Sequence, residues 1–209
     1  MSIQKTPLLP GHYYHIYNRG INSCDLFREH TNYEHFLGLY DKYISPVANT
    51  MAWVLMKNHF HLVVEILQVE CWGELPPPNP EGFGNLRGLE PEKRVYQQFS
   101  NLFNAYTKAY NKKYNRTGSL LEHPFRRIKV ESMDYLKNLI VYIHQNPVHH
   151  GFCNYPMDYP WSSYRTCISL KPTKLNREKV VACFGNTDEF ILYHNQQIQN
   201  LLIDEWFEI

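Results

Sequence analysis

Residues 51–66 read MAWVLMKNHFHLVVEI, and this stretch decides the fold class. Its two apolar, β-prone runs, at 51–56 and 59–66, are separated only by a Lys-Asn pair, which predicts two antiparallel strands joined by a tight turn. Side chains alternate along a strand, so we expect His59 and His61 on one face and the residue between them on the other.

The segments on either side of this hairpin complete a recognisable order of elements. Hydrophobic periodicity, capping residues and prolines predict a strand at 12–18, a helix at 31–44, a helix at 92–114, a strand at 125–131 and a helix at 133–146. We expect the last helix to end before Pro147, because proline disfavours helical geometry in the residue that precedes it. The first six elements predict an α+β protein with a ferredoxin-like β-α-β-β-α-β order, an antiparallel sheet and helices on one face.

The chain divides into one main domain at 1–150 and a C-terminal, helical appendage at 151–209. Within the main domain, residues 68–91 hold five prolines and four glycines and predict a long mobile loop. Within the appendage, we expect helices near 177–184 and 188–202. The last predicted helix of the main domain is followed by this tail rather than by a further strand.

Composition excludes several classes of protein. The 209 residues are 44% hydrophobic and 20% charged, which excludes a disordered chain, a collagen-like fibre and a coiled coil. No apolar run reaches the length of a membrane span, and the start does not resemble a signal peptide. Five widely spaced cysteines without a CxxC pair predict reduced thiols in the cytosol rather than a disulfide framework or a zinc cluster.

Charge is spread unevenly along the chain. The formal net charge is +1, but residues 92–131 carry nine Lys or Arg and three Glu, a formal charge of +6. Residues 186–209 carry five acidic residues and no Lys or Arg, a formal charge of −5. The basic segment is either a surface for an anionic ligand or a solvated helix face, and charge alone favours the second interpretation.

Four residues could form a site that combines a metal with a nucleophile. Two imidazoles on one face of a strand can chelate a metal ion, although His59 and His61 could equally be buried or surface histidines. Tyr142 and Asn146 are four residues apart, so they share one face of the last predicted helix. The Asn146 carbonyl would be a third ligand and the Tyr142 phenol a nucleophile. The alternatives are a core aromatic for Tyr142 and a helix-end residue for Asn146.

Several motifs, taken in order, resemble one protein family. KNHFHLVVE resembles the HUH motif, and VYIHQNPVHHGF resembles the catalytic-helix signature of the single-tyrosine HUH transposases, in particular the REP-associated tyrosine transposase branch. YHIYNRG, AWVLMKNHFH, FRRIKVES and YPWSSY are also similar to that family. The resemblance covers most of residues 11–164, and the combination is far more specific than any single motif.

The resemblance implies roles for these residues and a reaction. His59 and His61 match the metal-binding pair of the family, Tyr142 matches its nucleophile, and Asn146 takes the place of a third ligand that is glutamine outside this branch. The implied cofactor is a divalent metal, Mg²⁺ or Mn²⁺, and two imidazoles with an amide oxygen suit Mn²⁺ better. The implied activity of the domain at 1–150 is cleavage and rejoining of single-stranded DNA near hairpins through a 5′-phosphotyrosine intermediate.

The resemblance also implies a partner and a location. The expected partner is single-stranded DNA with hairpin or palindromic repeats, bound by a monomer or homodimer in the bacterial cytoplasm, on the nucleoid when bound to DNA, and not a membrane. Aromatic residues near Tyr13, Tyr14 and Tyr17 could stack bases or pack on the core. The candidate DNA-binding residues are basic and are Arg19, Lys112, Lys113, Arg116, Arg126, Arg127 and Lys129.

Two other functions stay open at this point. The chain could be an inactive or domesticated relative that only binds hairpin DNA. It could also be a metal-dependent phosphodiesterase in which Tyr142 is structural.

Overall fold

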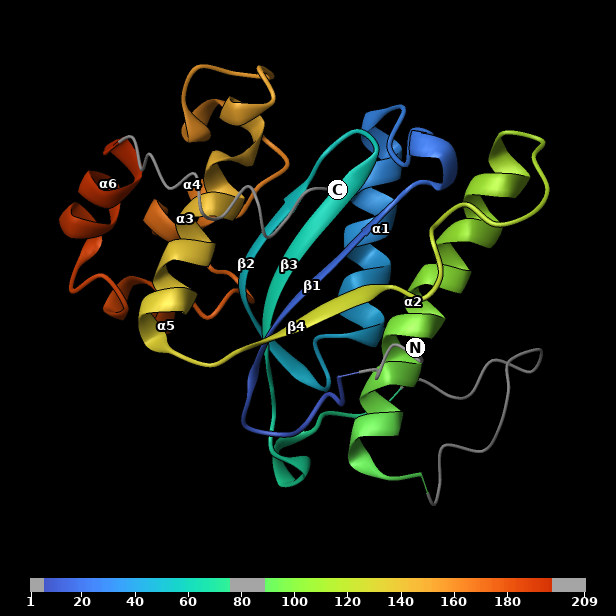
Figure 1. The fold of residues 1–209 in the computed structure, drawn as a ribbon, viewed down its shortest axis with the longest axis horizontal. Helices are drawn as coiled ribbons and strands as arrows, with labels where there is room; N and C mark the ends of the chain where they lie inside the picture. Colours follow the sequence, from blue (N-terminus) through green and yellow to red (C-terminus); the bar gives the residue numbers. More distant parts are fainter. Residues whose placement is uncertain (1–5, 76–88, 197–209) are drawn as a thin grey trace, which may run out of the picture.

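The fold is built on one four-stranded antiparallel sheet (Figure 1). The structure is a computed structural model that describes residues 6–75 and 89–196. The strands lie in the order β2-β3-β1-β4, and their bounds are Tyr13–Arg19 for β1, Ala48–Leu55 for β2, His59–Ile66 for β3 and Arg126–Val130 for β4. This order is that of a ferredoxin-like sheet, so the predicted fold class is confirmed.

Helices α1 (His30–Tyr43) and α2 (Pro91–Lys113) cover one face of the sheet. Their apolar sides bury Phe36 and Phe103 against Phe60 of β3, in the first of two hydrophobic cores. Helix α1 begins with a capping box, in which the Glu29 and Asn32 side chains each accept a hydrogen bond from the backbone amide of the other residue. Both helices match their predicted ranges to within one residue at each end.

Helix α3 (Met133–His149) lies on the opposite side of the sheet from α1 and α2 (Figure 1). It begins at Ser132, whose hydroxyl accepts a hydrogen bond from the Tyr135 amide at 3.1 Å. Leu136 and Ile140 of this helix pack with Val54 and Val63 of the sheet in the second core.

The prediction that α3 ends before Pro147 is wrong. Proline lacks an amide hydrogen and therefore removes one hydrogen bond from the last turn, but the following amides close that turn. The His150 amide donates to the Asn146 carbonyl at 3.1 Å, and the Phe152 amide donates to the Pro147 carbonyl at 2.8 Å. The helix therefore continues to His149, so His149 and His150 lie at the C-terminal end of the helix rather than in a loop after it.

Six short helices occur in the rest of the described chain. They are the 3₁₀ helices η1 (Ile21–Ser23), η2 (Val69–Cys71) and η3 (Pro156–Asp158), and the α-helices α4 (Tyr164–Ile168), α5 (Arg177–Ala182) and α6 (Thr187–Asn195). None of the helices in the described ranges has both the length and the apolar character of a membrane span. Residues 76–88 of the predicted loop, and 197–202 of the last predicted helix, lie outside the described residues.

The segment after residue 150, predicted as an appendage, contributes to the second core. Tyr164, Val180 and Phe190 of α4, α5 and α6 are buried in the same cluster as α3. The Leu55 amide donates to the Trp161 carbonyl at 2.9 Å, so the chain also runs along the outer edge of β2. This contact covers part of a strand edge that would otherwise be open to pairing with another molecule.

A buried polar network holds this segment to α3. The two ring nitrogens of His144 lie 2.9 Å from His194 Nε2 and 2.7 Å from the Ser163 hydroxyl. His194 Nδ1 in turn lies 2.7 Å from the Phe190 carbonyl, to which it donates. Burial lowers the pKa of His194 to about 4 and the pKa of His144 well below its usual value.

This network predicts that acid destabilises the fold. In the unfolded chain His144 and His194 take up protons near pH 6.5, whereas in the folded protein His194 stays neutral to about pH 4 and the pKa of His144 lies well below its usual value. The unfolded state therefore binds more protons in this interval, and the free energy of unfolding falls as the pH is lowered from about 7 to about 4. Chemical denaturation at a series of pH values measures this slope. A His194→Gln variant should show a shallower slope, and an unchanged slope would contradict the prediction.

Candidate active site

His59 and His61 lie on the face of the sheet that α3 covers. Across the β1–β3 pairing, His59 is opposite Arg19 and His61 is opposite Tyr17. The two imidazole rings are 5.3 Å apart between centroids and nearly perpendicular. Both side chains are buried, and His61 is fully so. The alternation of side chains along β3 therefore places both rings on one face, as predicted.

Helix α3 brings Tyr142 and Asn146 to this pair. Oδ1 of Asn146 lies 3.2 Å from Nε2 of His59, in a buried contact. The half-buried ring of Tyr142 lies 5.9 Å from the ring of His61 and is perpendicular to it. Four side chains from a strand and a helix, far apart in the sequence, are therefore adjacent in the fold.

The donor atoms at this point fit a divalent metal ion. Nε2 of His61 is buried and has no hydrogen-bond partner among the described residues, an arrangement that costs about 1–3 kcal/mol unless a ligand satisfies the atom. Burial lowers the pKa of His59 to about 4 and that of His61 well below its usual value, so both rings are neutral at pH 7 and keep a lone pair for a ligand. Within the described ranges no group of three or more His, Cys, Asp or Glu could hold a metal, so a site here depends on the Asn146 amide.

Further residues beside this site were not singled out by the sequence. Nδ1 of His59 lies 2.8 Å from Oδ1 of Asn58, which fixes the orientation of the ring, and Nδ1 of His61 lies 2.9 Å from Nε2 of His15. Because α3 continues past Pro147, the ring of His150 lies 5.3 Å from that of His59, and the ring of His149 lies 6.4 Å from that of Tyr142. The sequence offered no reason to choose His149 or His150, since the helix was expected to stop before them.

The predicted DNA-binding residues do not gather on one surface. Arg19 and Arg126 lie near the site, and both face Glu122, at 2.7 Å and 3.9 Å. Arg127 and Lys129 lie on the other face of the sheet, where the Arg127 guanidinium covers the Tyr96 ring at 4.9 Å. The remaining candidates lie at or just after the C-terminal end of α2 and are Lys112, Lys113 and Arg116. Of the whole set, Arg19 and Arg126 are therefore the best placed to contact a strand that enters the site.

Two of the three tyrosines suggested for base stacking pack inside the protein instead. Tyr14 is fully buried in the first core, and its hydroxyl accepts a bond from the Leu9 amide at 2.9 Å. Tyr17 is nearly buried and stacks on His15 at 4.7 Å and on His61 at 5.8 Å. Packing on the core is therefore the correct interpretation for Tyr14 and Tyr17.

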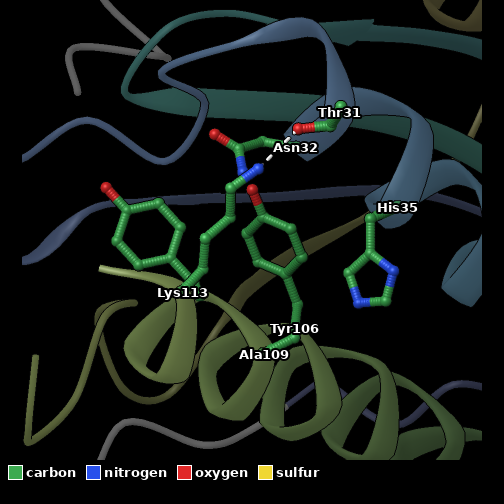
Figure 2. A pocket seen from close by; sticks show the side chains of 7 residues that line it. Thr31, Asn32, His35, Tyr106, Ala109 and Lys113 are labelled. Atoms are coloured by element: carbon green, nitrogen blue, oxygen red, sulfur yellow. Dashed lines mark hydrogen bonds between the residues drawn. The ribbon is translucent and has the colours of Figure 1, made fainter. Parts of the chain in front are cut away.

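A separate cavity of about 220 Å³ lies between α1 and α2 (Figure 2). Tyr106 and His35 line it, and the Lys113 ammonium donates to the Thr31 hydroxyl at 2.7 Å across its rim. Lys113 also pairs with Glu29 at 2.9 Å. The cavity is on the opposite side of the sheet from Tyr142, so it is not part of the site described above.

Comparisons with known proteins identify the fold. No family model and no curated protein matches the chain. The structure of a REP-associated tyrosine transposase bound to a REP hairpin aligns over 82% of this chain and 89% of that chain, with a TM-score of 0.52 and 16% identity. A bacterial tRNA(His) guanylyltransferase-like protein in complex with GTP aligns over 75% and 74%, with a TM-score of only 0.42 and 10% identity.

Proposed function

This chain has the fold of a REP-associated tyrosine transposase, and we propose that it cleaves and rejoins single-stranded DNA next to hairpins through a covalent bond to Tyr142. The observation that carries the proposal is the meeting of four side chains. The Asn146 amide contacts the ring of His59, and the Tyr142 ring packs on that of His61 from the same face of α3. The hairpin in the aligned structure, together with the motifs of residues 11–164, supports DNA of this kind as the substrate.

The reaction is a transfer of one phosphodiester bond. The Tyr142 oxygen attacks the DNA phosphorus and loses its proton, while the bond from phosphorus to the 3′ oxygen of the preceding nucleotide breaks. That oxygen takes up a proton and leaves as a free 3′-OH, and the 5′ phosphate stays on the tyrosine. Because a phosphodiester is replaced by another phosphodiester, a 3′-OH can reverse the step without a nucleoside triphosphate.

A divalent ion, Mg²⁺ or Mn²⁺, would be held by His59, His61 and Asn146, and when bound it polarises a phosphate oxygen as a Lewis acid. Asn58 keeps the ring of His59 oriented towards Asn146. The Arg19 and Arg126 guanidinium groups are charged and lie at the same end of the sheet, where they can bind backbone phosphates.

A labelled oligonucleotide tests this function. The substrate is single-stranded DNA that contains a hairpin drawn from the inverted repeats beside the coding region. With Mn²⁺, we expect a strand labelled at its 3′ end to become linked to protein on a denaturing gel, and a strand labelled at its 5′ end to be released as a shorter fragment. A chelator should abolish both products.

Other outcomes identify the alternative functions. Hairpin binding that is unaffected by the chelator, without any cleavage, would indicate a protein that only binds DNA. Cleavage without a covalent product would indicate a metal-dependent phosphodiesterase.

A further inference from the structure

We infer that His15 is a positioning residue that holds His61 in the tautomer whose Nε2 presents a lone pair to the candidate metal site. The inference rests on the proposed function, because it concerns the same metal site. It adds a residue that does not touch the metal or the DNA and acts only through its hydrogen bond to His61.

The geometry of the two rings carries the inference. His15 lies on β1, two residues before Tyr17, which is directly opposite His61 on β3. Nε2 of His15 and Nδ1 of His61 are 2.9 Å apart, and the two rings are nearly parallel, with centroids 5.1 Å apart. Both side chains have 0% exposure, so water cannot take the place of either ring in this contact. Tyr17 stacks on both rings and holds them in place.

Only one of the two possible hydrogen placements leaves His61 able to bind a cation. A neutral imidazole carries one hydrogen, so one of the two rings must donate and the other must accept. If His15 donates, Nε2 of His61 carries the hydrogen and cannot bind a cation. If His61 donates from Nδ1, its Nε2 keeps a free lone pair beside His59 and Tyr142.

Binding of a cation therefore requires an acceptor for the Nδ1 hydrogen of His61, and His15 supplies it. Asn58 makes the corresponding contact with Nδ1 of His59, whose Nε2 faces Oδ1 of Asn146, the third candidate ligand, at 3.2 Å. Such outer partners of metal-binding histidines typically change metal affinity by about 10–100-fold when they are removed.

Mn²⁺ binding to the full chain, without DNA, tests the inference. The electron paramagnetic resonance signal of free Mn²⁺ measures the dissociation constant directly and does not depend on catalysis. We expect His15→Phe, which keeps a ring but loses the acceptor, to raise the dissociation constant by about 10–100-fold. We expect His15→Gln to recover most of the affinity, because its side-chain carbonyl can accept the same hydrogen bond.

A matched control separates positioning from stability. Tyr14→Phe also removes one hydrogen bond from β1, a partly buried one, but on the opposite face of the sheet. Its melting temperature should fall while its Mn²⁺ affinity stays that of the wild type. If His15→Phe does not fold, His15→Leu replaces it as the variant without an acceptor.

The possible failures are distinguishable. If the wild type binds Mn²⁺ and the variant without an acceptor binds it equally well, the role of His15 is wrong and the proposed function is untouched. The role of His15 is also wrong if His15→Gln binds Mn²⁺ no more tightly than the variant without an acceptor. If the wild type does not bind Mn²⁺, the metal-dependent function fails together with the inference.

Discussion

Replacing Tyr142 by phenylalanine should eliminate the covalent protein–DNA product and lower strand cleavage by about 10⁴-fold or more. Losses of this order follow when a nucleophile that forms a covalent intermediate is removed, because the rest of the site cannot replace its attacking atom. The Tyr142 ring is half-buried against His61, and phenylalanine keeps that packing while it removes only the hydroxyl. The adduct on a denaturing gel and the single-turnover rate of cleavage measure the effect.

Tyr135 is a matched control on the same helix, seven residues before Tyr142. Its hydroxyl is buried without a hydrogen-bond partner among the described residues, and burial raises its pKa. Tyr135→Phe should therefore keep both cleavage and the adduct. Hairpin binding and Mn²⁺ binding should be unchanged in Tyr142→Phe, because neither requires the phenol. If cleavage survives in Tyr142→Phe, the tyrosine is structural and the chain is a metal-dependent hydrolase.

Replacing His61 by alanine should lower metal-dependent cleavage by about 10³-fold, because a Lewis-acid metal contributes several kcal/mol to stabilisation of the transition state. Nε2 of His61 has no hydrogen-bond partner in the described part of the chain, so the substitution removes a proposed ligand that makes no other contact through this atom. Cleavage is measured over a range of Mn²⁺ concentrations, since a site that is only weakened would recover at high metal.

Two measurements make the His61 result interpretable. The far-ultraviolet circular dichroism spectrum and melting temperature show whether His61→Ala still folds, because the change leaves a cavity beneath α3. His35→Ala removes an exposed histidine of α1 on the other side of the sheet and should cleave like the wild type. Cleavage by His61→Ala that stays at the wild-type rate and still responds to a chelator would place the metal elsewhere.

Local patterns were enough to predict the framework of this site. The strand that carries His59 and His61 has the predicted bounds, because a run of β-prone residues behind a two-residue turn leaves little freedom in register. Tyr142 and Asn146 share a helix face because their spacing is close to one helical turn. Both inferences concern neighbours along the chain, where sequence spacing determines geometry directly.

What the sequence could not predict depends on long-range packing. His15 reaches His61 only through the pairing of β1 with β3, and a shift of one residue in that pairing would turn it to the other face. His150 approaches His59 because α3 runs past a proline that usually ends a helix. The basic residues were predicted as one set, but alternation along β4 separates Arg126 from Arg127.

The spacing of Tyr142 and Asn146 on one rigid helix has a consequence for the order of events. Any sliding or rotation of α3 moves the Tyr142 phenol and the Asn146 carboxamide together, so a shift of the helix that withdraws the proposed nucleophile also withdraws a proposed metal ligand. If both residues act as proposed, binding of the ion and docking of the nucleophile are coupled, and each favours the other by the same free energy. Binding of the ion would then place the attacking group before the DNA is cut.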